Sequence, residues 1–73
     1  MSRLPERTAV DSSLLSSIGY SIEATLELAF RSGAIYRSFA VPHAVFQALI
    51  AAESKGASFN RHVRNRFRYQ RLA

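Results

Sequence analysis

The first half of the chain carries the hydrophobic pattern of extended strands. In ATLELAF, Leu26, Leu28 and Phe30 alternate with polar or small side chains, as in a strand with one buried face. A second run, AIYRSF, is rich in β-branched and aromatic residues and follows the Ser32-Gly33 pair, which is typical of a tight turn. With the earlier stretch SSLLSSIGYS, these runs predict a three-stranded antiparallel meander. The predicted strands span residues 12–20, 23–31 and 34–40.

The hydrophobic period changes from two to 3.6 residues at Pro42. Proline suits the first turn of a helix, and apolar residues then recur at spacings of three and four as far as Gly56, which is suited to end a helix. We expect a second helix to begin at Ser58, whose hydroxyl is able to cap the free N–H groups. Its apolar line is formed by Phe59, Val63 and Phe67. The predicted helices span residues 42–54 and 58–67.

These elements predict an α+β fold in which a three-stranded antiparallel meander is followed by two α-helices. A chain of 73 residues has room for one domain, and a hydrophobic content of 48% is typical of a globular core. We expect a flexible N-terminus over residues 1–9 and the folded domain over residues 10–73. The expected buried centre consists of Leu26, Leu28, Phe30, Phe46, Leu49, Ile50, Phe59 and Val63.

Several classes of protein are disfavoured by the composition. The chain has no cysteine, so it has neither a disulfide framework nor a thiolate metal site, which suits a reducing cytoplasm. No apolar run approaches the roughly 18 residues that a membrane span needs. We therefore expect a soluble cytoplasmic protein without a membrane partner, a metal or a cofactor.

Positive charge is concentrated at the C-terminal end. The formal net charge is +5, yet residues 1–53 are close to neutral and the whole excess follows Glu53. A basic end on a neutral body is typical of proteins that meet polyanions. The basic residues after Glu53 are Lys55, Arg61, Arg64, Arg66, Arg68 and Arg71.

The spacing of the arginines indicates a surface. On a helix over residues 58–67, Arg61, Arg64 and the following Arg68 fall at i, i+3 and i+7, displaced from the apolar line. Arginine offers a planar fork of donors suited to phosphate, and aromatic rings among the cations are able to stack on bases. The candidate nucleic-acid-binding residues are Lys55, Arg61, Arg64, Arg68, Tyr69, Arg71 and Tyr36. A solvated helix face without a partner has the same pattern.

The junction ESKGASFN is a second candidate site. If one helix ends at Gly56 and the next begins at Ser58, free N–H groups, the Lys55 ammonium and the Asn60 amide converge on a position suited to an anion. The predicted anion-binding residues are Lys55, Gly56, Ser58 and Asn60. The alternative is a simple pair of helix caps.

The sequence shows no arrangement of residues that is typical of a catalytic site. His43 and His62 are not at a metal-ligand spacing with a carboxylate, and no serine sits in a nucleophile-elbow context. The carboxylates are scattered along the chain. We therefore expect no enzyme, no catalytic residues and no metal site.

The succession VDSSLLSSIGYS, LELAFRSGAIYRSFAVP, VFQALIAAESKGASFN and VRNRFRYQRL resembles the KTSC domain, a short bacterial module named for the C-terminus of some lysyl-tRNA synthetases. The resemblance extends from about Val10 to Leu72. The family is described by a central Tyr-x-Tyr, whereas here Tyr36 is followed two positions on by Ser38, so half of a possible stacking platform is missing. The resemblance implies no established activity, and RNA binding is only suggested for the family.

Two functions remain open. The first is weak, sequence-independent binding of RNA or another nucleic acid through the arginine-rich C-terminal face. The second is a protein-interaction or accessory module, for which an exposed sheet edge and the apolar helix line are candidate surfaces of self-association. The two hypotheses differ in whether the basic residues and the aromatic rings must lie on one face.

Overall fold

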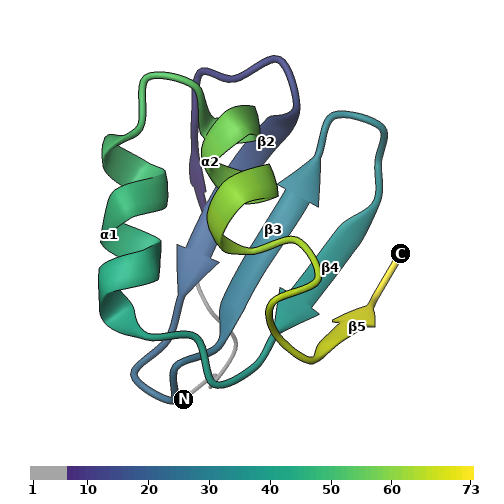
Figure 1. The fold of residues 1–73 in the computed structure, drawn as a ribbon. Helices are drawn as coiled ribbons and strands as arrows, with labels where there is room; N and C mark the ends of the chain where they lie inside the picture. The colour runs from purple at the N-terminus through teal and green to yellow at the C-terminus, as the bar shows by residue number, and fades with distance from the viewer. Residues whose placement is uncertain (1–6) are drawn as a thin grey trace.

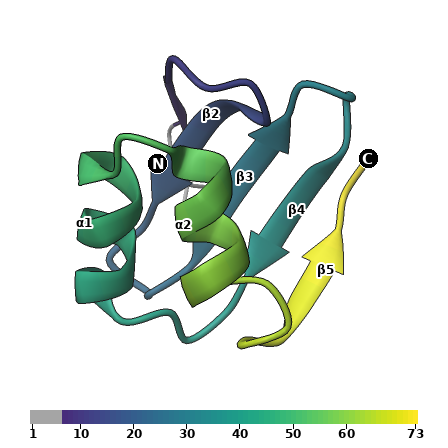
Figure 2. The ribbon, with the colours of Figure 1, turned by 45° about the horizontal axis from the view of Figure 1, so that its top comes forward.

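The computed structural model describes residues 7–73, which form a five-stranded antiparallel sheet with two helices on one face (Figures 1 and 2). The strands follow one another across the sheet in chain order, and both helices come between the fourth strand and the fifth. The predicted α+β class and single small domain are therefore confirmed. The elements are β1 (Arg7–Ala9), β2 (Leu15–Tyr20), β3 (Leu26–Phe30), β4 (Ile35–Ser38), α1 (His43–Ala51), α2 (Lys55–His62) and β5 (Tyr69–Arg71).

The predicted number of strands is wrong, because the edge strands β1 and β5 escape the sequence pattern. All residues of these two strands are exposed, so neither shows the alternation of buried and exposed positions from which strands are predicted. β1 forms by pairing with β2, and β5 by pairing with β4. β1 also shows that residues 7–9 of the N-terminal segment expected to be flexible are part of the sheet, whereas residues 1–6 lie outside the described residues.

The three central strands and the turn between β3 and β4 agree with the prediction. Gly33 has φ 98°, a conformation that a residue with a Cβ adopts only at a cost. Its N–H donates to the Phe30 carbonyl at 2.9 Å, and the Phe30 N–H donates to the Ala34 carbonyl at 2.8 Å. These bonds close the hairpin and set the register of β4, which places Tyr36 opposite Leu28.

Helix α2 begins earlier than predicted, at Lys55 instead of Ser58. Ser54 is its N-cap, and the Ser54 hydroxyl accepts a hydrogen bond from the Ala57 N–H at 3.2 Å. Gly56 consequently lies in the first turn of α2 and does not end α1; a Cβ added there would meet the Leu14 Cβ at 3.4 Å. Both helices are also shorter than expected: α1 ends at Ala51 and α2 at His62.

The core lies between the sheet and the helices. Seven apolar side chains form it, and they are Leu15, Ile18, Leu26, Leu28, Val41, Leu49 and Val63. Leu26, Leu28, Leu49 and Val63 confirm the prediction for those residues. Ile50 was expected in the core but is 38% exposed, because Leu49 faces the sheet and the next residue on a helix is turned about 100° away.

Three of the expected core residues, Phe30, Phe46 and Phe59, are only partly buried at the margin of the core. Phe46 stacks on Tyr20 with ring centroids 4.8 Å apart, and the Tyr20 hydroxyl donates to the Val41 carbonyl. This contact holds the start of α1 against the end of β2. Phe30 and Phe59 meet edge-on, with ring centroids 5.2 Å apart.

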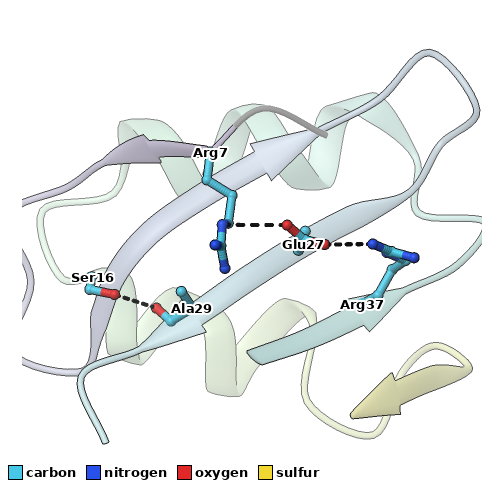
Figure 3. A network of polar contacts seen from close by, with 5 residues as sticks. All are labelled: Arg7, Ser16, Glu27, Ala29 and Arg37. Carbon is cyan, nitrogen blue, oxygen red and sulfur yellow. Dashed lines mark hydrogen bonds and ion pairs between the residues drawn. The ribbon is translucent and has the colours of Figure 1, made fainter. Parts of the chain in front are cut away.

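The face of the sheet away from the helices carries a buried acidic residue between two arginines (Figure 3). The Glu27 carboxylate lies 2.8 Å from Arg37 Nη2 and 3.4 Å from Arg7 Nε. Strand register explains how Arg7 spans a strand, because Gly19 lies between Arg7 and Glu27 and has no side chain to block the path. The network joins β1, β3 and β4, and one carboxylate is shared between two arginines.

A candidate binding groove between α2 and β5

A groove of about 570 Å³ lies between α2 and β5. Figure 2 shows that β4 and β5 lie beyond α2. One bank comes from α2 and the turn after it, and the other comes from β5. Its floor is formed by β3 and β4. The lining residues, which define the aromatic groove, are Leu14, Phe30, Ser32, Ala34, Tyr36, Ser38, Phe59, Asn60, Val63, Arg64, Asn65, Phe67, Tyr69 and Arg71.

Four aromatic rings follow one another along the groove from α2 to β5. Phe59 meets Phe30 edge-on at 5.2 Å between centroids, and Phe30 meets Tyr36 in the same way at 5.5 Å. Tyr36 in turn meets Tyr69 at 5.6 Å with an interplanar angle of 67°. Such edge-to-face pairs hold one another in place, which gives the groove a rigid aromatic wall.

The pairing of β4 with β5 brings Tyr36 and Tyr69 together. Tyr36 lies opposite Arg71 and Ser38 lies opposite Tyr69, so Tyr36 and Tyr69 are diagonal neighbours on the same face. Ser38 is buried and small, and it leaves the space beside Tyr36 to the ring from β5. In this chain the second ring beside Tyr36 is supplied by β5, and position 38 does not contribute one.

Both banks of the groove carry an arginine. The Arg71 guanidinium carbon lies 5.7 Å from the centroid of the Tyr36 ring, a cation–π geometry, and Arg71 Nε donates to the Ala73 carbonyl at 2.8 Å. On the other bank, Arg64 Nη1 donates to Asn60 Oδ1 at 3.4 Å. Among the described residues that line the groove, none is acidic. The groove therefore combines π faces with two guanidinium groups.

The structure brings together only part of the predicted nucleic-acid-binding set. Tyr36, Arg64, Tyr69 and Arg71 line the aromatic groove. Arg61 is exposed on α2 but does not line the groove.

The prediction that the arginines form a stripe along one helix is wrong. Helix α2 ends at His62, and Asn65, with φ 60°, turns the chain toward β5. Arg68 thus lies beyond the helix, beside a second hollow that Phe39, Ala40, Arg66 and Phe67 also line. Its backbone carbonyl accepts a hydrogen bond from the Phe39 N–H at 2.9 Å.

The predicted anion site at the helix junction loses its geometric basis. The Ser58 N–H donates to the Ser54 carbonyl at 3.1 Å within α2, and the Ser58 side chain is buried, so neither is free at a helix start. Lys55 Nζ donates to the Ala52 carbonyl at 3.0 Å. Asn60 lines the aromatic groove instead, where its amide contacts Arg64.

Phe30 and Phe59 are site residues that the sequence did not reveal. Their spacing placed them in the core, and only their partial burial shows that they line the groove.

Within residues 7–73, no three histidine or acidic side chains are grouped so that they could hold a metal ion. No helix in that part of the chain is long and apolar enough to span a membrane.

Comparison with known proteins decides the family. The model of the KTSC domain family matches residues 11–67, which is most of the chain. The chain belongs to the KTSC domain family. The resemblance found in the sequence is thereby confirmed.

Relatives of this KTSC domain occur alone and within larger enzymes. An uncharacterized protein of Stutzerimonas stutzeri is 46% identical over 69 residues, covering 92% of this chain and 97% of that protein. A lysine–tRNA ligase of a Nostoc species is 43% identical over 49 residues, which is 67% of this chain but only 9% of the ligase. The crystal structure of a KTSC domain protein from Yersinia pestis matches with a TM-score of 0.91 and 31% identity, covering 96% of this chain and 100% of that one.

Proposed function

We propose that this KTSC domain is a non-enzymatic module that binds RNA or another nucleic acid weakly and without sequence specificity. The aromatic groove and the arginines beside it form the contact surface. The observation that carries the proposal is that Tyr36 and Tyr69 share one face with Arg64 and Arg71 and that no acidic residue lines that face among the described residues. Rings that stack on bases and cations that neutralise phosphates are the two components of sequence-tolerant nucleic-acid binding.

Two further facts support a nucleic-acid partner. The relatives that carry a similar segment include enzymes named for a tRNA substrate, the lysine–tRNA ligases. In addition, Arg7 and Arg37 share the Glu27 carboxylate on the opposite face of the sheet, and the basic residues outside that network lie mostly toward the C-terminal end. The absence of cysteine agrees with a cytoplasmic location, where RNA is available.

The direct test is binding of a fluorescein-labelled RNA, measured by fluorescence anisotropy at 50 and 200 mM salt. Two phosphates held by Arg64 and Arg71 give a slope of log affinity against log salt near −1.4 on a single strand. We expect micromolar binding at low salt that weakens about sevenfold over this fourfold change in salt. Absence of measurable binding at 50 mM salt would refute the proposal.

A second candidate function, protein interaction, is favoured by the outer face of α1. The exposed residues of this helix include no charged side chain, and they are His43, Ala44, Gln47, Ala48, Ile50 and Ala51. The short edge strands β1 and β5 offer further backbone for self-association. Sedimentation velocity over a hundredfold range of protein concentration tests this function; association that Ile50→Glu abolishes would support it, and a monomer throughout would count against self-association.

A further inference from the structure

We propose that the aromatic groove holds an unpaired nucleotide, so that the domain binds single-stranded nucleic acid in preference to a duplex. The inference rests on the proposed function and specifies which form of nucleic acid the site accepts. It commits the groove to one occupant, a base in the groove with its flanking phosphates on the two banks.

Tyr69 is the most exposed ring of the groove's aromatic chain. This side chain is 59% exposed although its ring meets Tyr36, so the remainder of the ring is available to a ligand. The Tyr36 ring is less available, because Arg71 lies over it and Phe30 meets it edge-on. Tyr69 is therefore the ring on which an incoming base stacks.

The groove is large enough for a nucleotide. A volume of about 570 Å³ falls within the range of roughly 300 to 1,000 Å³ that small-molecule sites occupy. A nucleotide is a ligand of this class. The bases of a double helix are stacked inside it, so a duplex is unable to present a base face to the Tyr69 ring.

Positive charge lies on both sides of the groove. Arg64 belongs to the helix side and Arg71 to the β5 side, so one cation lies on each bank. The strand that enters the groove meets a guanidinium on either side of the stacked base. Neither arginine forms an ion pair with an acidic side chain in the described part of the chain. Arg71 Nε donates to the Ala73 carbonyl and Arg64 Nη1 to Asn60, so phosphates would be bound by the other N–H groups of each guanidinium.

The test compares a labelled 16-nucleotide RNA with the same strand annealed to its complement, by fluorescence anisotropy at 50 mM salt. We expect the single strand to bind at least about fivefold more tightly, the lower end of what one stacked base contributes. Tyr69→Ala should remove this preference, whereas Tyr69→Phe should keep it. Phe39→Ala is the matched control, since Phe39 is an exposed aromatic residue, 37% accessible, that does not line the groove.

A second readout locates the ligand. The Tyr69 ring protons should shift upfield in NMR spectra when the single strand is added, because a stacked base lies over them. Equal affinity for duplex and single strand, or a preference that survives Tyr69→Ala, would overturn the groove assignment while leaving general nucleic-acid binding intact. Binding to neither form would instead overturn the proposed function itself.

Discussion

Two charge-matched double variants separate a specific groove from a general attraction to positive charge. Arg64→Gln with Arg71→Gln removes the two cations that line the aromatic groove, and Arg61→Gln with Arg68→Gln removes two that do not line it. Both variants lower the formal net charge from +5 to +3. A response to net charge alone must therefore be the same in the two proteins.

The expected size of the effect follows from the number of phosphates. Each phosphate contact adds about −0.7 to the slope of log affinity against log salt on a single strand, so the groove pair accounts for about −1.4. We expect the groove variant to lose that contribution. The factor by which a fourfold rise in salt weakens RNA binding should then be about sevenfold smaller than in the wild-type protein. The flanking variant should lose less than half as much of the slope.

The assay is fluorescence anisotropy of one labelled RNA titrated with each protein at 50, 100 and 200 mM salt. Thermal denaturation followed by circular dichroism provides the folding control, because exposed arginines contribute little to stability and all three proteins should melt within a few degrees of one another. Equal losses of slope in the two variants would refute the idea that the groove is the contact surface. Such a result would leave only a diffuse attraction to the basic end.

Three further predictions concern stability, measured by urea denaturation. Leu28→Ala deletes a fully buried side chain from the middle strand and should lower the free energy of unfolding by about 2–5 kcal/mol; a loss below about 1 kcal/mol would contradict its place in the core. Glu27→Gln leaves Arg37 and Arg7 without their carboxylate and should cost about 2–4 kcal/mol, less than a fully buried pair because Arg7 is 33% exposed; an unchanged stability would mean that the ion pairs contribute nothing. Ser54→Ala removes the N-cap of α2 and should cost about 1 kcal/mol, and no loss would argue against the observed helix start.

The sequence determined those parts of the molecule whose cause is local. The alternation around Leu28 specifies a strand with one buried face, because side chains of a strand point to opposite sides. The change of period at Pro42 specifies the first helix, and Gly33 specifies the turn that sets the hairpin. These features need only the chain's own geometry and the burial of its apolar residues. The fold class follows from them.

Tertiary structure decided the edge strands and the site. β1 and β5 have no buried face and exist because β2 and β4 offer backbone groups to pair with, which no local pattern records. The start of α2 depended on a choice between two serines only four residues apart, both suited to capping. Capping preference alone does not distinguish the two serines.

The aromatic groove shows the same division most clearly. Arginine content indicated a polyanion partner, because net charge is a property of composition. The contact between Tyr69 and Tyr36, 33 positions earlier in the chain, required the β4–β5 register. The partial exposure of Phe59 to the groove required α2 to stop short of β5. A site built from residues distant in sequence depends on how the strands align, and that alignment is fixed only when the whole sheet forms.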